Sequence, residues 1–294
     1  MKKKVLITGG SSGFGALMVK SLINDGHTVT ASMRGVNGKN QASAAKMTAL
    51  GAHVVEIDVT SDDSVNTGVA DAINKMGGLD VVVNNAGIGV LGIQEQFDSE
   101  EMKKLFDVNV FGVQRVNKAA LPHLRGQESG LLIQISSLLG RVNLPFYGPY
   151  NASKWAVEAL AEGYRLELSN FGVDSVIVEP GGFPTNFFGN LMFPKDKSND
   201  AEYGPMAEAP KQMFDSFEGA LAQNPEQKPQ MVADAVLNLV NTPAGERPAR
   251  TVVDKMGMGD HIDPYNRQLD QIHEGILGAF GMGDMLKLNV AEKA

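Results

Sequence analysis

A tyrosine and a lysine in the middle of the chain stand at a spacing that suits proton transfer. Tyr150 and Lys154 are four residues apart at the start of a segment with a helical pattern, so they would share one helix face. A phenol has a pKa of about 10 and exchanges a proton near neutral pH only if that pKa falls by roughly 2–3 units. The ammonium group of Lys154 favours such a fall. Ser137 ends a strand-like run shortly before this helix and adds a hydroxyl to the group.

Two neighbouring residues are alternatives to this assignment. Ser136 is an alternative to Ser137, and Tyr147 is an alternative to Tyr150, although the residue four positions after Tyr147 is Asn151 rather than a lysine. A tyrosine and a lysine at this spacing also occur by chance in many helices, so the pair needs support from its surroundings.

A glycine-rich turn near the start of the chain points to a nucleotide ligand. Gly9, Gly13 and Gly15 follow the buried-strand run 5–8 and open a helical segment. Glycines let the backbone turn tightly and approach a pyrophosphate, and a helix N-terminus offers unpaired N–H groups. The turn therefore predicts a dinucleotide site, and a tight turn without a ligand is the alternative.

The elements that must position these residues alternate along the first two-thirds of the chain. Apolar runs predict strands at 5–8, 28–32, 53–57, 79–83, 131–135 and 173–178. Helical patterns follow them at 13–25, 42–50, 61–76, 100–124 and 150–171. This alternation predicts an α/β fold, a Rossmann-type doubly wound parallel sheet with helices on both faces. Ligands bind beyond the carboxyl ends of the strands in such sheets, which is where both the glycine turn and Ser137 stand.

The last third of the chain has a different pattern. We expect a helix at 231–240, a last strand at 250–253, and a tail over 264–294 of helices broken at Gly278 and Gly281. The segment 189–210 is rich in Pro, Asn, Asp and Lys, predicts a long loop with a short helix, and is interpreted as a lid. We expect a single domain, in which residues 1–255 form the dinucleotide-binding catalytic part with a variable substrate loop at about 189–225. Residues 256–294 would form its C-terminal helical extension.

The motifs on these elements resemble those of the classical short-chain dehydrogenase/reductase family. Thr8 to Gly15 match the family spacing of Thr-Gly, three residues, Gly, one residue and Gly. Further matches follow in family order and cover about residues 3 to 186, namely Asn84-Asn85-Ala86-Gly87, Asn109, Ser137, Tyr150-Asn151-Ala152-Ser153-Lys154 and Pro180-Gly181-Gly182-Phe183-Pro184-Thr185. The resemblance implies an oxidoreductase that moves a hydride between a nicotinamide and a carbonyl or alcohol.

The resemblance also implies a role for each residue of the site. Ser137 would hold the substrate oxygen, Tyr150 would exchange the proton, and Lys154 would stabilise the tyrosinate and bind the nicotinamide ribose. Asn109 would support a water relay to the lysine, with structural hydrogen bonding as its alternative role. The cofactor-binding residues are expected to be Thr8, Gly9, Ser11, Ser12, Gly13, Phe14, Gly15, Arg34, Asp58, Val59, Asn85, Ala86, Gly87, Tyr150, Lys154, Pro180, Gly181, Phe183 and Thr185, with Asp58 at the adenine.

The end of the second strand predicts which nicotinamide cofactor the chain prefers. Met33 stands where NAD-preferring relatives carry an acidic residue, and Arg34 follows it. A hydrogen bond to a charged group contributes about 1.5–3 kcal/mol, which predicts that NADPH is preferred over NADH on the order of 10- to 100-fold. Ser12 stands where some relatives carry a basic residue, and a solvated Arg34 is the alternative. An NAD-dependent alcohol or hydroxysteroid-like dehydrogenase is the corresponding alternative function.

Apolar and aromatic side chains dominate the expected substrate wall. The substrate-binding residues are expected to be Ser137, Leu138, Tyr147, Tyr150 and Phe187. Their apolar surroundings are expected from Leu139, Phe146, Phe183, Phe188, Leu191, Met192 and Phe193, some of which are alternatively core residues. This set favours a small hydrophobic ketone or secondary alcohol. Met256, Met258, Met282 and Met285 are interpreted as packing residues.

Composition excludes several classes of protein. The net charge of −8 argues against nucleic acid as a partner, and the absence of cysteine excludes disulfides and thiolate metal sites. The five histidines have no metal-ligand spacing, so no metal is expected. No apolar run is long enough for a membrane helix, and we expect a cytoplasmic protein.

The helix that begins at Tyr150 also bears on assembly. In the resembled family it often packs against a partner subunit, so a homodimer or homotetramer is expected. A non-catalytic dinucleotide-sensing regulator is a remote alternative, because such proteins tend to lose the tyrosine or lysine that this chain keeps.

Overall fold

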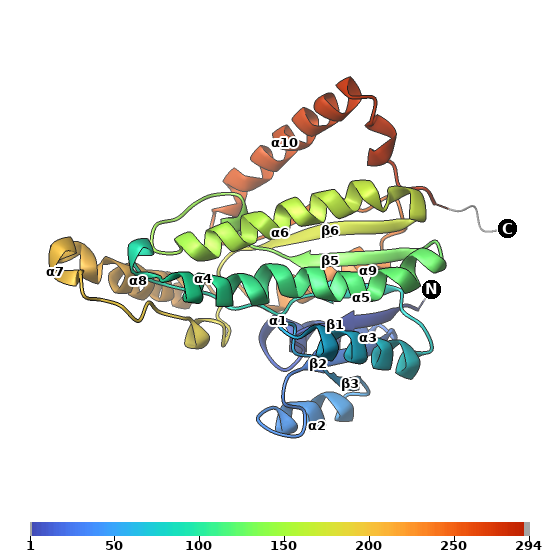
Figure 1. The fold of residues 1–294 in the computed structure, drawn as a ribbon, viewed down its shortest axis with the longest axis horizontal. Coiled ribbons are helices and arrows are strands. Elements are labelled where there is room, and N and C mark those ends of the chain that lie inside the picture. The colour runs from blue at the N-terminus through green and yellow to red at the C-terminus, as the bar shows by residue number, and fades with distance from the viewer. Residues whose placement is uncertain (1, 291–294) are drawn as a thin grey trace.

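The computed structural model describes residues 2–290, which form a seven-stranded parallel sheet between two layers of helices (Figure 1). The strand order is β3-β2-β1-β4-β5-β6-β7. The chain builds outward from β1 to β3 and then crosses to β4 on the other side of β1. The order therefore reverses between β1 and β4, and ligands of doubly wound sheets bind at such a point.

The bounds of the elements follow the alternation expected from the sequence. The strands are β1 (Lys4–Ile7), β2 (Thr28–Met33), β3 (His53–Glu56), β4 (Val81–Asn84), β5 (Gly130–Ile135), β6 (Val173–Pro180) and β7 (Arg250–Val253). The helices are α1 (Gly13–Asn24), α2 (Gln41–Ala49), α3 (Asp62–Met76), α4 (Ser99–Phe106), α5 (Gly112–Gly126), α6 (Gly148–Glu167), α7 (Asp200–Tyr203), α8 (Ala209–Gln223), α9 (Gln230–Asn241) and α10 (Gly259–Ala279). The predicted α/β class and the parallel sheet are confirmed.

Strand β1 shows why its sequence is continuously apolar. Successive side chains of a strand point to opposite faces of the sheet. Val5 and Ile7 belong to the core under α1 and α9, whereas Leu6 belongs to the core under α3 and α5. Both faces are covered, so the strand has no solvent side on which a polar residue would be favoured.

The predicted helix over 100–124 contains a defect at its middle. A π-helical turn, Asp107–Phe111, joins α4 to α5. The guanidinium of Arg115 donates hydrogen bonds to the carbonyls of Val59 and Asp107, at 3.1 and 3.3 Å, and so satisfies a carbonyl at the start of this turn. Asn109 lies within the turn, and single π-turns are frequent at functional sites.

The variable segment contains more helix than the sequence pattern predicted. Residues 189–210 hold the expected short helix, α7, but the 15-residue helix α8 follows directly at Ala209. The tail prediction was also wrong in part, because Gly278 lies inside α10 and the helix begins at Gly259. Over the described part of the chain, no helix is long and apolar enough to cross a membrane. No three His, Asp or Glu side chains gather in a metal-binding arrangement within residues 2–290.

Candidate active site

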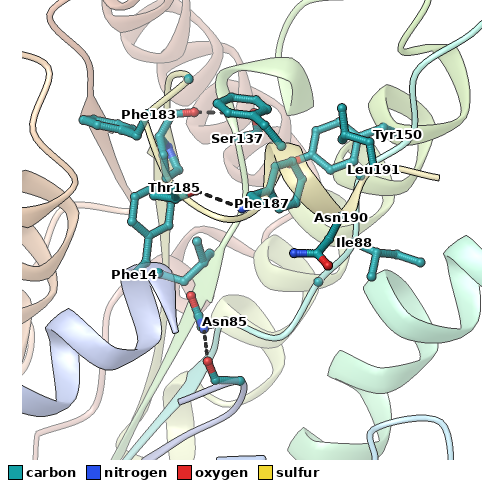
Figure 2. A pocket seen from close by; sticks show the side chains of 18 of the residues that line it. Phe14, Asn85, Ile88, Ser137, Tyr150, Phe183, Thr185, Phe187, Asn190 and Leu191 are labelled. Carbon is teal, nitrogen blue, oxygen red and sulfur yellow. Dashed lines mark hydrogen bonds between the residues drawn. The ribbon is translucent and has the colours of Figure 1, made fainter. Parts of the chain in front are cut away.

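A cavity of about 850 Å³ opens at the carboxyl ends of β1, β4, β5 and β6. Figure 2 shows Ser137, Tyr150 and Phe187 around one part of this cavity and Phe14, Phe183 and Thr185 around another. The sheet brings together side chains that are far apart in the sequence. The wall includes every residue predicted to bind cofactor or substrate or to act in catalysis, except Thr8, Gly15, Asp58 and Asn109.

The turn after β1 leaves its backbone open toward the cavity. A Cβ atom added at Gly15 would lie 2.2 Å from the carbonyl oxygen of Gly9, so only glycine lets these backbones meet. Gly13 has a φ of +53°, and a Cβ there would meet only Thr185, at 3.9 Å, among the described residues. The side chain of Ser12 makes no capping hydrogen bond to the first turn of α1. Free N–H groups at a helix N-terminus beside an open glycine backbone fit a dinucleotide pyrophosphate.

Thr8 and Asn85 hold this turn against β4. The Thr8 hydroxyl accepts hydrogen bonds from the backbone N–H groups of Asn85 and Ala86, at 3.0 and 3.1 Å. The Asn85 amide donates to the carbonyls of Thr8 and Gly9, at 2.9 and 3.2 Å. Thr8 is buried, and its hydroxyl is already hydrogen-bonded to the protein backbone. It therefore stabilises the glycine turn rather than contacting a ligand. Asn85 and Ala86 reach the cavity wall.

Ser137, Tyr150 and Lys154 converge on the cavity from β5 and α6. The Ser137 hydroxyl accepts from the N–H of Leu139 at 3.1 Å and lies 3.4 Å from the carbonyl of Pro180, to which it donates. The Lys154 ammonium donates to the carbonyl of Ile135 at 2.8 Å and lies 5.6 Å from the centre of the Tyr150 ring. These contacts fix the side chains of the serine and the lysine near the phenol.

Burial shifts the pKa values of both proton-bearing groups toward their neutral forms. It raises the pKa of Tyr150 well above its ordinary value, although a hydrogen bond with Ser137 opposes the shift. It lowers the pKa of Lys154 to about 8, against an attraction from Glu158. The phenol is therefore a protonated donor near neutral pH. The fall in the pKa of Tyr150 that the sequence predicted is not present in the protein alone.

Asn109 does not line the cavity, and its side chain makes three hydrogen bonds to neighbouring residues. Its Oδ1 accepts from the N–H of Ile88 at 2.9 Å, and its Nδ2 donates to the carbonyl of Ile88 at 2.9 Å and to Ser153 Oγ at 3.1 Å. The side chain thus joins the segment after β4 to α6. This arrangement matches the structural alternative for Asn109, and its part in a water relay stays a prediction.

Arg34 lines the end of the cavity at β2, and about half of its side chain is exposed to solvent. Its side chain is 52% exposed, and Nη1 lies 3.9 Å from Asp58 Oδ2. Asp58 also accepts from the N–H and hydroxyl of Thr60, which lower the pKa of its carboxyl. A pair this exposed contributes little, so the guanidinium is free to take a stronger anion.

The substrate side of the cavity is lined by aromatic rings and methionines. Phe187 packs against Tyr150 with ring centres 5.9 Å apart, and Phe188 packs against Phe217 of α8 at 5.4 Å. Leu138, Leu139, Tyr147, Phe183, Leu191 and Met192 also line the wall as predicted, whereas Phe146 and Phe193 do not.

Several residues of this wall were missed or misread in the sequence. Met213 and Phe217 belong to α8, which the loop prediction passed over, and Met256 and Met258 line the cavity rather than serve only as packing. The apolar spacing of Met213, Phe217 and Leu221 was a helical signal that could have identified α8. Nothing in the local pattern of residues 254–258 marks them as part of the wall.

Comparison with known proteins agrees with this architecture. The family model described as short chain dehydrogenase matches residues 3–194. A 3-ketodihydrosphingosine reductase of Bacteroides thetaiotaomicron is 38% identical over 199 residues, which cover 68% of this chain and 71% of that protein. Retinol dehydrogenase 8 of Bos taurus is 34% identical over 251 residues, which cover 82% of this chain and 78% of that protein. The crystal structure of a short-chain dehydrogenase from Streptomyces avermitilis superimposes with a TM-score of 0.74 at 30% identity, covering 95% of this chain and 98% of that one.

Proposed function

The chain belongs to the short-chain dehydrogenase family, and from this premise we propose that it is an NADP(H)-dependent oxidoreductase for a hydrophobic ketone or secondary alcohol. The observation that carries the proposal is the convergence of Ser137, Tyr150 and Lys154 on one cavity with the open glycine turn. The phenol and the ammonium face a space in which a carbonyl group fits.

The residues of the site divide the reaction between them. When bound, the nicotinamide supplies or accepts the hydride, and in its oxidised form it adds a positive charge near the phenol. In reduction, the Ser137 hydroxyl and the Tyr150 hydroxyl donate hydrogen bonds to the substrate oxygen, and Tyr150 Oη then gives its proton to that oxygen. The ammonium of Lys154 stabilises the tyrosinate that remains. Because burial raises the pKa of Tyr150, the free phenol is suited to the donor role in reduction.

We assign the cofactor preference to Arg34. Its guanidinium has only the exposed Asp58 carboxylate as an ion-pair partner in the described chain, and Met33 places no carboxylate beside it. A 2′-phosphate is therefore favoured over a bare hydroxyl at this end of the cavity. The NAD-dependent alternative requires that Arg34 stay solvated when the cofactor binds.

We assign a hydrophobic substrate to the wall of aromatic rings and methionines. Methionine side chains adapt to irregular apolar shapes, and Met213, Met256 and Met258 stand on one side of the cavity. One relative is named 3-ketodihydrosphingosine reductase and another is named retinol dehydrogenase 8. Both names refer to molecules that are largely hydrocarbon. The hydrocarbon character of these two molecules supports an apolar substrate for this chain.

The test is the initial rate of NADPH and NADH oxidation with a panel of bulky apolar and small polar ketones. We expect NADPH to be used about 10- to 100-fold more efficiently than NADH and the bulky apolar ketones to react fastest. Equal rates with the two cofactors would favour the NAD-dependent alternative. Tight binding of both cofactors without turnover of any ketone would favour the sensing regulator.

We also propose that the chain acts in the cytoplasm as a homodimer or homotetramer. Trp155 lies on the outer face of α6 and is 42% exposed, as expected of a side chain that a second subunit covers. Light scattering on the purified protein measures its mass, and a monomer at micromolar concentration would contradict the assembly.

A further inference from the structure

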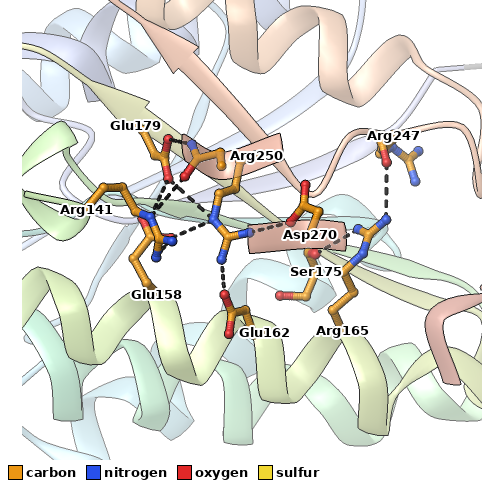
Figure 3. A network of polar contacts seen from close by, with 10 residues as sticks. Arg141, Glu158, Glu162, Arg165, Ser175, Glu179, Arg247, Arg250 and Asp270 are labelled. Atoms are coloured by element: carbon orange, nitrogen blue, oxygen red, sulfur yellow. Dashed lines mark hydrogen bonds and ion pairs between the residues drawn. The ribbon is translucent and has the colours of Figure 1, made fainter. Parts of the chain in front are cut away.

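Behind the candidate active site lies a cluster of charged side chains with almost no access to solvent (Figure 3). The buried charge cluster consists of Arg141, Glu158, Glu179 and Arg250, whose side chains are 4%, 2%, 0% and 5% exposed. They come from the turn after β5, from α6, from β6 and from β7. Charges this deeply buried are costly unless they are paired.

The two guanidiniums of the cluster share its two carboxylates. Arg250 Nε lies 3.2 Å from Glu158 Oε2 and 3.5 Å from Glu179 Oε1. Arg141 lies 3.7 Å from Glu158 and 3.8 Å from Glu179. Arg250 also reaches the partly exposed Glu162 and Asp270 at the rim of the cluster. The buried cluster therefore sets two guanidiniums against two carboxyl groups.

Helix α10 closes the cluster from outside the region that the family model covers. Asn266 accepts a hydrogen bond from Arg141 Nε at 3.0 Å and donates one to Glu179 Oε2 at 2.6 Å. Asp270 accepts from Arg250 at 3.0 Å. The C-terminal helix is thus connected to the back of the site through charged groups.

Three of the four segments that carry a cluster residue also carry a residue of the candidate active site. Arg141 ends the short turn that begins at Ser137, and Glu158 lies one helical turn after Lys154. Glu179 directly precedes Pro180, whose carbonyl accepts the hydrogen bond of Ser137. The cluster therefore joins from behind the segments that hold the serine, the lysine and the loop after β6.

Glu158 has the closest relation to the proton-transfer groups. A Cβ atom added at Gly140 would lie 2.8 Å from Ser136 Oγ and 3.1 Å from Glu158 Cγ, so both side chains pack against this glycine. Ser136 is the neighbour of Ser137. The charge of Glu158 also acts on Lys154 and opposes the fall in the pKa of the lysine that burial causes.

The neighbouring charges act on both carboxyl groups of the cluster. Burial raises the pKa of Glu158, and Arg141 and Arg250 pull it back. The pKa of Glu179 is raised by burial and further by the charge of Glu158. Burial thus acts on both carboxyl groups, and the guanidiniums of Arg141 and Arg250 oppose it at both.

We propose that Glu158 is a positioning residue that places a buried carboxylate one helical turn behind Lys154 and holds the Ser137 turn against α6 through Arg141. Replacing a buried ion pair by apolar groups is often neutral for stability, so stability alone does not require these charges. The carboxylate of Glu158 lies one helical turn from Lys154 and favours the ammonium form of the lysine in a site with little water. An apolar side chain at position 158 would not have this effect. The inference rests on the proposed function, because only there does Lys154 have a role in catalysis.

The first measurement is independent of activity and is made on the protein without cofactor or substrate. The protein is labelled with [13Cε]lysine, the Lys154 resonance is identified by its loss in Lys154→Arg, and its titration is followed by NMR. In Glu158→Gln we expect the pKa of Lys154 to fall by about one unit, a tenfold change in the amine-to-ammonium ratio. In Glu158→Asp, which keeps the charge, we expect a smaller fall.

The matched control is Glu162→Gln. Glu162 lies one turn farther along α6 and contacts the same Arg250, but it is 31% exposed and is not among the groups that act on Lys154. We expect this variant to leave the titration of Lys154 unchanged. An unchanged pKa in Glu158→Gln, or an equal fall in Glu162→Gln, would overturn the proposal.

The second measurement is the pH profile of kcat for ketone reduction. The alkaline limb, which requires the ammonium of Lys154, should move to lower pH in Glu158→Gln and stay in place in Glu162→Gln, with the KM of NADPH little changed. If wild type reduces no ketone, the proposed function fails while the NMR result still decides the role of Glu158. If Glu158→Gln does not fold, the double variant Glu158→Gln/Arg250→Gln, which keeps the net charge of the cluster, replaces it. The same fall in the pKa of Lys154 and the same shift of the pH profile are then expected.

Discussion

Around the turn that runs from Gly9 to Gly15, neighbouring backbones lie so close that one added carbon atom has no room. A Cβ at Gly15 would overlap the carbonyl of Gly9, whereas a Cβ at Gly189 would have no described atom within 4 Å. Gly15 lies in the turn after β1, and Gly189 lies in the segment after β6 next to Phe187 and Phe188, which adjoin the cavity. The cofactor side is fixed by backbone contacts, and the substrate side is shaped by side chains that can be exchanged.

The same contrast holds for the polar groups. On the cofactor side, Thr8 and Asn85 form four hydrogen bonds between two strand ends. On the substrate side, Phe188 packs edge to face against both Phe187 and Phe217. Hydrogen-bonded backbone tolerates little change. We therefore expect the chemistry to depend on the rigid side of the site and the choice of substrate to depend on the adaptable side.

The largest effect should come from the rigid side, where the proton is transferred. Tyr150→Phe removes the hydroxyl that donates the proton and keeps the ring that packs on Phe187. We expect kcat to fall by roughly 10²- to 10⁴-fold, the usual contribution of a general acid, with thermal unfolding little changed. Tyr147→Phe is the control, since Tyr147 lines the same cavity and has no lysine one turn on. Full activity of Tyr150→Phe would rule out the proposed mechanism.

The packing contrast itself is tested by a pair of glycine substitutions. In Gly15→Ala the new Cβ meets backbone at 2.2 Å, so the turn must shift, and we expect a loss of about 1–3 kcal/mol in the free energy of unfolding. In Gly189→Ala the new Cβ meets nothing in the part of the chain that the structure describes, and we expect a change below about 0.5 kcal/mol. Urea denaturation of both variants gives the two values. Equal losses would show that the two walls do not differ in this way.

We propose that cofactor choice depends on a single exposed side chain, Arg34, so the effect of replacing it should be intermediate. Arg34→Ala removes the cation proposed to meet the 2′-phosphate, and we expect the preference for NADPH over NADH to fall by about 10- to 100-fold. Arg267→Ala is matched in charge but lies on α10 in an exposed pair with Asp263. The ratio of kcat/KM for the two cofactors is the measurement. A preference that survives Arg34→Ala places the discrimination elsewhere in the site.

The same contrast explains what the sequence could and could not predict. Strands and glycine turns follow from local apolar runs and backbone requirements, so β7 was predicted at its observed bounds and the glycine turn directly after β1. The spacing of Tyr150 and Lys154 predicted a shared helix face because helix geometry is fixed.

Most of the misses concern features that depend on distant contacts, whereas helix α8 was missed although its signal is local. The π-turn at Asn109 and the meeting of Glu158 with Arg250 join residues whose proximity no local pattern records. Met256 was read as packing because only the folded chain brings the segment after β7 to the cavity. The long helix α8 was missed since Pro210 and weak periodicity resembled a loop, although Pro is well tolerated in the first turn of a helix.

The smallest effect should come from the adaptable wall, and it should depend on the substrate. Phe217 lines the cavity and packs on Phe188, while Phe214 packs on the same ring from outside the wall. We expect Phe217→Ala to raise the KM of a bulky apolar ketone about tenfold, because apolar contact area is lost, and to leave a small ketone almost unaffected. Phe214→Ala should leave both KM values near those of wild type. If Phe217→Ala instead lowers kcat equally for both ketones, α8 acts on the rigid side of the site, and the division between a fixed and an adaptable wall is wrong.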